Sequence, residues 1–256
     1  AMGMKCALSR GLIGEDQKRV DENLKLIDDW HGKKGLLSVQ LGPHAPYTVP
    51  MNAMKKISEL ALERNVGIHT HFLETEWERQ YLRDELHCQP VEYLEKTGLL
   101  NTPRTILAHG VWFLPEELPL LKDSNITIVH NPNSNLKLGS GIMPLPEMID
   151  QGISVSLGTD GAASNNRLDI WEELRHGALI HKGVRHDPTI LKAKQILTMA
   201  TFNGARGLGF EKTGLIRETW DADLVLIDLD RPHYLGFDVE TLPVYIVYAG
   251  SSTDVE

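Results

Sequence analysis

The sequence predicts an α/β fold of the (β/α) barrel type, in which parallel strands alternate with helices. Short apolar runs rich in β-branched residues alternate with segments whose apolar residues recur at spacings of three and four. Hydrophobic residues make up 41% of the 256 residues, which is enough for a substantial buried core. Ionisable residues also follow five consecutive strand candidates, at the positions where βα loops form the active site of such a barrel.

Six segments have the strand pattern, and they occupy residues 4–9, 36–41, 66–72, 105–109, 126–130 and 153–157. Helical periodicity predicts helices over residues 15–30, 51–64, 167–182 and 189–208. Because eight strands close the usual barrel, six strands predict an incomplete one. The chain begins with Ala1 and stops just after an apolar segment, so we expect it to be truncated at both ends.

The chain changes character after the last predicted helix. Residues 221–230, DADLVLIDLD, have a strand pattern, and residues 244–250, VYIVYAG, form a short apolar element of undetermined type. We therefore expect a barrel domain over residues 1–215 and part of a small β-rich appendage over residues 216–256.

The acidic composition favours a small-molecule partner. The formal net charge is -9, whereas nucleic acids and anionic membranes favour clustered Lys and Arg. No apolar run approaches the roughly 20 residues of a membrane span. Cys6 and Cys88 have no disulfide or thiolate-metal spacing, which fits a reducing cytoplasm and leaves any metal to His and carboxylate ligands.

Two strand ends carry the residues best suited to a metal site. His71 and Glu74 form an HxxE arrangement after the third strand, which can place an imidazole on a metal and a carboxylate close to a substrate. Asp160 lies in GTDG after the sixth strand, where its carboxylate is expected to project into the barrel mouth. In isolation, the same patterns are also typical of a packed histidine, a first-turn glutamate and a turn aspartate.

The other strand-end histidines have less specific surroundings. His109, in LAHG, is suited to hydrogen bonding to an attacking hydroxide or to a substrate atom that gains charge. His44, in GPHAPYT, is expected to contact substrate, and Thr48 to pack within the same loop. His69 lies one layer deeper than His71, which favours interior packing or indirect support of the site. For His130, a structural and a functional role are left open.

The motifs GPHAPYT, HTHFLETE, LAHGVW, HNPNSNLKLGSGI and LGTDGAASNNRLDIWEE resemble those of the amidohydrolase superfamily, specifically the 5-methylthioadenosine/S-adenosylhomocysteine deaminases. The resemblance runs over nearly the whole chain, and the ordered set with SNLKLGSG and DGAASNN is its most specific part. It implies a (β/α)8 barrel of the metal-dependent hydrolase type, of which this chain would hold strands three to eight.

The resemblance also implies a role for each site residue. His71 and Asp160 would ligate one divalent metal, with zinc expected and iron as the alternative. Glu74 would be the acid/base, Asp160 would accept the proton of the reactive water, and His109 would lie beside that water. The implied substrate contacts are His44, Ser164, Arg10 and Arg19.

One part of the family pattern has no match in the chain. The first strand of the family carries an HxH pair that supplies two further metal ligands, and we expect this pair in sequence ahead of Ala1. His69 and His71 could instead be that pair, which would complete a site within the chain. Only three predicted strands follow them up to Asp160, however, so they fit the fifth barrel strand better than the first.

The implied reaction is hydrolytic deamination of 5-methylthioadenosine, S-adenosylhomocysteine or adenosine to the inosine-type product and ammonia. The expected partner is thus a small nucleoside, and neither nucleic acid nor membrane. A guanine deaminase or triazine chlorohydrolase-like amidohydrolase is the alternative enzyme, and a catalytically silent fragment is the alternative that the missing HxH pair favours. Because an open barrel exposes strand edges, we also expect a homo-oligomer.

Overall fold

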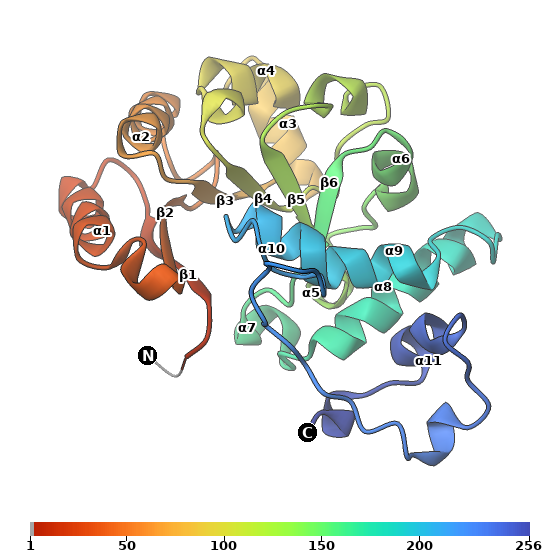
Figure 1. Ribbon diagram of the computed structural model, residues 1–256. Helices are drawn as coiled ribbons and strands as arrows, with labels where there is room; N and C mark the ends of the chain where they lie inside the picture. The colour runs from red at the N-terminus through yellow and green to blue at the C-terminus, as the bar shows by residue number, and fades with distance from the viewer. Residues whose placement is uncertain (1–2) are drawn as a thin grey trace.

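The computed structural model describes residues 3–256 and contains one parallel sheet of six strands, as the sequence predicts. The strands lie side by side in the order of the chain, and every neighbouring pair is parallel. The sheet curves, and helices surround its outer side (Figure 1). The strands are β1 (Cys6–Leu12), β2 (Leu37–Pro43), β3 (Ile68–Phe72), β4 (Thr105–His109), β5 (Ile126–His130) and β6 (Ser154–Leu157).

Helices connect the strands and follow the last of them. The α-helices are α1 (Gln17–Trp30), α2 (Met51–Arg64), α3 (Glu76–Asp84), α4 (Pro90–Lys96), α5 (Pro132–Leu138), α6 (Leu145–Asp150), α7 (Ala162–Asn165), α8 (Ile170–Arg185), α9 (Ala193–Thr198), α10 (Gly204–Gly207) and α11 (Leu242–Tyr248). Short turns of 3₁₀ or π helix are η1 (Lys33–Gly35), η2 (Leu99–Asn101), η3 (Leu118–Leu121), η4 (Met199–Asn203), η5 (Pro232–Tyr234) and η6 (Ser252–Asp254). The predicted helix over residues 189–208 is therefore three segments, α9, η4 and α10, and η4 is π-helical.

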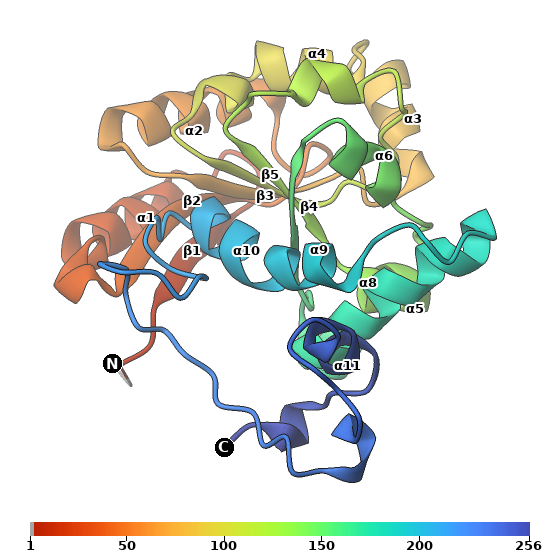
Figure 2. The same cartoon turned by 45° about the vertical axis from the view of Figure 1, so that its right-hand side comes forward.

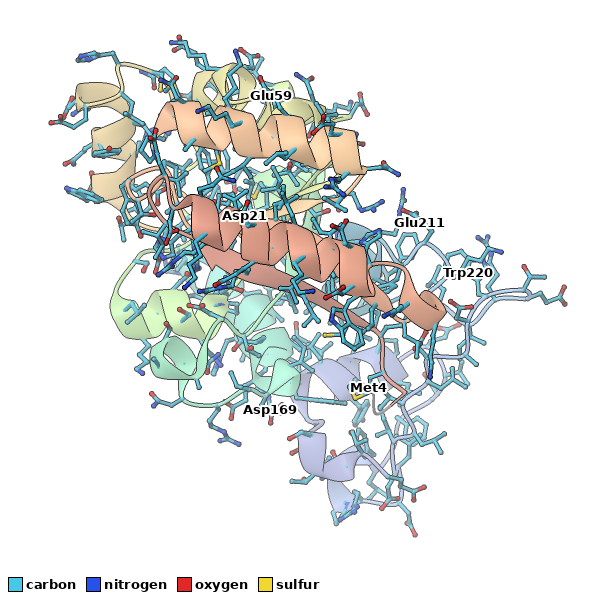
Figure 3. All side chains as sticks on the ribbon, turned by 90° about the vertical axis from the view of Figure 1, so that its left-hand side faces the viewer. Met4, Asp21, Glu59, Asp169, Glu211 and Trp220 are labelled. Carbon is cyan, nitrogen blue, oxygen red and sulfur yellow. The ribbon has the colours of Figure 1, made fainter. Side chains whose placement is uncertain are left out.

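Local signals in the sequence set the helix ends. Asp16 caps α1 by accepting the backbone N–H of Arg19, and Thr75 caps α3 by accepting that of Glu78. Asn65 ends α2 in the left-handed conformation with φ 51°. Figure 3 shows α1 and α2 running alongside each other on the outside of the sheet, with Asp21 and Glu59 on them.

The core lies between the sheet and its outer helices. Val39 and Leu41 of β2, Ile68 of β3 and Met54 and Ile57 of α2 are all fully or almost fully buried. Burying an aliphatic side chain of this size contributes about 1.5–3 kcal/mol, so this layer holds the strands that carry the strand-end residues.

The described sheet is open. β1 and β6 are its two edges, and within residues 3–256 they are not paired with each other. A cavity of about 490 Å³ lies on the inner side, lined by residues of β1, β6 and α10 among others. Figure 2 shows α9 and α10 running along this side of the sheet. The arrangement agrees with the predicted incomplete barrel.

The tail differs from the prediction. Over residues 216–256 we expected a β-rich segment, but the described structure has one isolated bridge, between Ile227 and Val255, and residues 242–248 form helix α11. An extended segment becomes a strand only where a neighbouring backbone pairs with it, and an alternating pattern such as DADLVLIDLD does not supply that neighbour. The division at residue 215 remains a prediction.

None of the helices within residues 3–256 combines the length and the apolar character needed to cross a bilayer.

Candidate active site

Three strand ends bring the ionisable residues to one edge of the sheet. His71 in β3 is in register with Ala108 of β4, and Phe72 with His109, so the two histidines lie one register position apart at the carboxyl ends of neighbouring strands. Asp160 follows β6 in the loop before α7. His109 and Asp160 have φ angles of 79° and 61°, a conformation that few non-glycine residues adopt. The backbone thus turns sharply where these side chains leave the strands.

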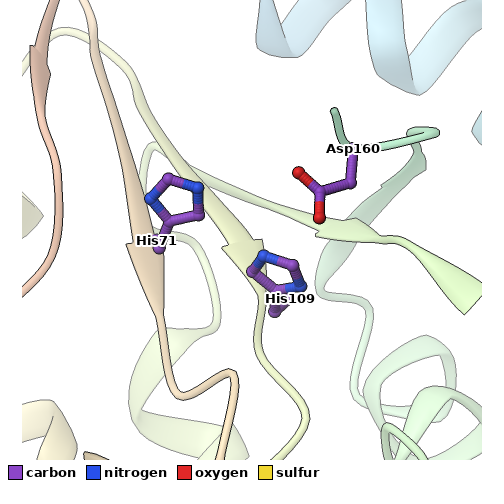
Figure 4. Close-up of side chains that lie close together, drawn as sticks. All are labelled: His71, His109 and Asp160. Atoms are coloured by element: carbon purple, nitrogen blue, oxygen red, sulfur yellow. The ribbon is translucent and has the colours of Figure 1, made fainter. Parts of the chain in front are cut away.

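His71, His109 and Asp160 form one cluster. One ligand atom from each residue lies within 4.8 Å of the others, and Figure 4 shows the two rings and the carboxylate around a common space. The rings of His71 and His109 are 5.6 Å apart, centroid to centroid. Two imidazoles and one carboxylate are donors that suit zinc or iron, so the residues present fit a divalent metal.

A backbone carbonyl orients His71. Its Nδ1 lies 2.7 Å from the carbonyl oxygen of His44, and a carbonyl can only accept, so Nδ1 carries the hydrogen. The unprotonated nitrogen is then Nε2. Metal-ligating histidines usually have such a partner on the other ring nitrogen, because it fixes both the tautomer and the ring orientation.

Hydrogen bonds hold Asp160 in its ionised form. Ser134 Oγ donates to Oδ2 at 2.6 Å, and the backbone N–H of Gly161 donates to Oδ1 at 2.7 Å. Burial alone would raise the pKa of Asp160, but these bonds, with His109 and Ser164 adding to them, bring its pKa below the ordinary value. Asp160 is therefore a carboxylate at neutral pH.

His109 is the most enclosed member of the cluster, with 1% of its surface exposed. Burial lowers its pKa, against the opposing effects of Glu74 and of a hydrogen bond to Asn135. Its Nδ1 is 2.9 Å from Asn135 Oδ1, and its Nε2 is 3.7 Å from Glu74 Oε2. Ser140 Oγ lies 3.5 Å from the other oxygen of Glu74. The proposed acid/base is thus beside the cluster.

His44 stands next to His71, with ring centroids 4.8 Å apart. Its Nδ1 is 2.8 Å from Thr48 Oγ1, whose hydroxyl donates to the carbonyl of Ala45. Nδ1 of His44 is therefore the donor, and Nε2 is left as an acceptor. Burial, followed by the neighbouring His71, lowers the pKa of His44, so the ring is neutral at pH 7. Thr48 was predicted to pack within this loop, and its hydroxyl also orients the ring of His44.

The inner cavity opens beside these residues. His44, His69, His71 and Asp160 are among the residues that line it. The side chain of His69 is exposed to the cavity rather than packed in a solid interior, and desolvation by the surrounding protein lowers its pKa to about 4. It is a neutral lining residue.

Two of the residues predicted to contact the substrate lie near Asp160 or near the cavity wall. Ser164, in α7, is close enough to Asp160 to lower its pKa by hydrogen bonding. Arg19 is paired with Asp16, and its Nη1 is 3.5 Å from the carbonyl of Gly11, a residue of the cavity wall.

Arg10 is not brought to the cluster. It alternates along β1 with the cavity-lining Ser9 and Gly11, and its Nε donates to Glu22 Oε2 at 2.8 Å. His130 is also separate: it is fully buried, and its Nε2 is 3.4 Å from Nε2 of His181 in α8. The structure thus favours the structural role for His130.

Sequence reasoning did not identify four residues that support the site, which are Ser134, Asn135, Ser140 and Glu78. Three of them belong to the motif NPNSNLKLGSG, which resembles the family as a unit but does not indicate a role for each member. Spacing along the chain could not assign them, because Asn135 and His109 are 26 positions apart and meet only in the folded protein.

The family model and the similar proteins agree on one family for this chain. The model of the amidohydrolase family matches residues 1–252. The chain is 41% identical to a 5-methylthioadenosine/S-adenosylhomocysteine deaminase of Dictyoglomus thermophilum, over 99% of this chain and 60% of the relative. It is 40% identical to a 5'-deoxyadenosine deaminase of Methanococcoides burtonii, over 99% of this chain and 59% of the relative.

A solved structure has a fold very similar to that of this chain. An adenosine deaminase from Xanthomonas campestris with bound zinc superposes with a TM-score of 0.92 at 31% identity, covering 98% of this chain and 58% of that one. The chain therefore spans about 60% of the length of the curated relatives it matches.

Proposed function

Since this chain belongs to the amidohydrolase family, we propose that it is the major part of the catalytic barrel of a metal-dependent aminohydrolase. Its substrate is an adenosine-type nucleoside, namely 5-methylthioadenosine, S-adenosylhomocysteine or adenosine, and the products are the inosine-type nucleoside and ammonia. The observation that carries the proposal is the convergence of His71, His109 and Asp160 within 4.8 Å, with Glu74 beside them. The names of the relatives support the substrate class.

His71 and Asp160 would hold one divalent ion, for which zinc is our proposal. The hydrogen bond at Nδ1 leaves Nε2 of His71 for a metal, and the ionised carboxylate of Asp160 can ligate without losing a proton. When bound, such an ion lowers the pKa of a coordinated water to roughly 7. The zinc in the structure of the Xanthomonas protein supports this choice.

Three side chains would then move or hold protons. Asp160 accepts the proton that the attacking water loses, because its hydrogen bonds leave it ionised beforehand. Glu74 delivers a proton to the purine ring nitrogen next to the amino-bearing carbon, so that the addition product is neutral. His109 forms a hydrogen bond with the attacking oxygen. Asp160 then passes its proton to the amino nitrogen, the C–N bond breaks to release ammonia, and Glu74 takes up the hydroxyl proton as the carbonyl forms.

The substrate would lie in the inner cavity. His44 at its rim, with Nε2 as an acceptor, and Ser164 near Asp160 are our proposed contacts to the nucleoside, and Arg19 is a proposed contact for a polar tail. Arg10 would need to leave Glu22 to take part. The net charge of -9 supports a small neutral substrate over nucleic acid. Free Cys6 and Cys88 support a cytoplasmic location.

Measuring ammonia release by the full-length natural protein tests this proposal. The substrates to compare are 5-methylthioadenosine, adenosine, guanine and a chlorotriazine, with zinc content measured in parallel. We expect turnover of one of the first two, at least 1,000-fold loss in Asp160→Asn, and no loss in Asp150→Asn at the exposed end of α6. Turnover restricted to guanine or the triazine would reject the substrate class, and a zinc-free, inactive protein would reject the enzyme.

A further inference from the structure

Two consecutive side chains of α5 contact the proposed site. Ser134 Oγ donates to Asp160 Oδ2 at 2.6 Å, and Asn135 Oδ1 lies 2.9 Å from His109 Nδ1. Both residues are buried, with 0% and 1% of their surfaces exposed. One short helix therefore reaches both the residue that ends β4 and the residue that follows β6.

The backbone around Asn135 is held at both ends of α5. Pro132 occupies the first turn, and the N–H of Asn135 donates to the carbonyl of Asn131. At the other end the N–H of Ser140 donates to the carbonyl of Asn135, and Trp112 Nε1 donates to the carbonyl of Ser140 at 2.7 Å. These bonds fix the backbone at Asn135 and so fix the position from which its side chain extends.

The surroundings of Nδ1 decide which nitrogen of His109 carries the hydrogen. Asn135 Oδ1, which can only accept, is at 2.9 Å, whereas the amide Nδ2 of Asn131 is at 3.5 Å. The shorter contact is a normal hydrogen bond and the longer one is at its limit. Nδ1 is therefore the protonated nitrogen, and Nε2, on the side of Glu74, has the free electron pair.

We propose that Asn135 is a positioning residue that holds His109 as the Nδ1–H tautomer, so that Nε2 is an acceptor toward the reacting atoms. The inference rests on the proposed function only for its catalytic consequence, because the tautomer itself is a property of this chain. His109 then accepts a hydrogen bond from the attacking water and cannot donate one while it is neutral. Loss of Asn135 leaves a buried N–H without a partner, and the ring is expected to shift its hydrogen to Nε2.

The variants Asn135→Ala and Asn135→Asp test the proposal, with Asn133→Ala as the matched control. Asn133 is on the same helix, but its carboxamide contacts His176 instead of the site. We expect Asn135→Ala to lower kcat about 10- to 100-fold with a smaller change in KM, as removal of such supporting partners generally does. Asn135→Asp keeps an acceptor at Nδ1, so it should retain more of kcat, and Asn133→Ala should match the parent.

A second readout is independent of activity and metal. In metal-free protein with ¹⁵N-labelled histidine, long-range ¹H–¹⁵N NMR distinguishes a protonated Nδ1 from a protonated Nε2. We expect protonated Nδ1 at His109 in the parent, Asn133→Ala and Asn135→Asp, and protonated Nε2 or a mixture in folded Asn135→Ala. Protonated Nε2 in the parent, or an unchanged tautomer in Asn135→Ala, would overturn the proposal even if the protein proved to act on another substrate. Failure of deamination with the expected tautomers would instead overturn only the proposed function.

Discussion

Glu78 is a buried carboxylate next to the proposed acid/base. It is fully buried in α3, and its Oε2 accepts the backbone N–H of Glu74 at 3.0 Å, while Oε1 has no hydrogen-bond partner within the described residues. Burial raises the pKa of Glu78 to about 7, against the backbone hydrogen bonds, which lower it. The backbone of the loop that carries Glu74 is thus hydrogen-bonded to the Glu78 carboxyl group, which is about half protonated at neutral pH.

This residue gives a testable dependence of stability on pH. Because the pKa of Glu78 is raised on folding, its contribution is fully present below about pH 4.5 and is lost as the pH rises through about 7. The difference corresponds to about 3 kcal/mol of unfolding free energy. Glu78→Gln should remove this decline between pH 5 and pH 8, as measured by urea unfolding, whereas the exposed Glu76→Gln should keep it. Parallel curves for the parent and Glu78→Gln would contradict the assignment.

At the scale of elements, an ion pair joins α3 to the loop after β4. Arg79 binds both carboxylate oxygens of Glu117, at 2.8 and 2.9 Å, and the carbonyl of Trp112 at 3.0 Å. Little of either side chain is exposed. The helix after Glu74 and the loop after His109 are therefore fixed relative to each other.

Breaking this pair from one side should destabilise the protein. Arg79→Ala leaves the Glu117 carboxylate largely buried without its partner, and we expect a loss of about 3 kcal/mol. Arg83→Ala, also in α3, removes an exposed pair with Asp84 and should change stability by less than about 1 kcal/mol. Chemical denaturation measures both. The double change Arg79→Met with Glu117→Leu should recover part of the loss, and equal effects of Arg79→Ala and Arg83→Ala would contradict the expectation.

The turn after β4 also depends on a glycine. Gly110 has φ +58°, and an added Cβ would lie 2.6 Å from Cγ2 of Ile128 in β5. Both the backbone conformation and the contact oppose a side chain, so Gly110→Ala should cost about 3 kcal/mol. Gly183→Ala in α8 meets open space and should stabilise the protein by about 0.5–1 kcal/mol. Thermal unfolding tests both, and a neutral Gly110→Ala would show that the turn is not constrained.

At the scale of the whole molecule, the tail over residues 216–256 is bound at two places, to Lys5 just ahead of β1 and to helix α8, which follows β6. Lys5, next to β1, binds Asp221 and Asp223 at 2.6 Å each. Arg175 of α8 donates to the carbonyls of Tyr248 and Gly250. The segment over residues 221–230 is thus held by side chains and by one backbone bridge, although it has the composition of a strand.

The open sheet predicts self-association of this chain. β1 is an edge strand with Leu8 exposed, and an unpaired edge is a site for pairing with another molecule. We expect light scattering to report a species larger than the monomer. Leu8→Lys should shift the distribution toward monomer, since a charge on an edge strand opposes pairing, while Leu62→Lys on α2 should not. A monodisperse monomer in the unmodified chain would contradict this prediction.

The sequence by itself determined the six strands, their parallel order and the family. These properties follow from short-range patterns: the apolar runs at residues 105–109 and 126–130 match β4 and β5 residue for residue, because burial on both faces selects β-branched and apolar residues. The positions of His71, His109 and Asp160 at strand ends were predictable for the same reason, since parallel strands place their carboxyl ends at one edge.

Only the tertiary structure decided which side chains support the site and which elements form in the tail. Asn135 acts on His109, Thr48 on His44 and Glu78 on the loop of Glu74, and none of these contacts has a signature in local spacing. Arg10 faces Glu22 because strand alternation turns it away from the cavity. Hydrogen-bond partners and strand neighbours come from segments distant in the chain. A local pattern therefore determines which secondary structure a segment can form, but not which residues it contacts.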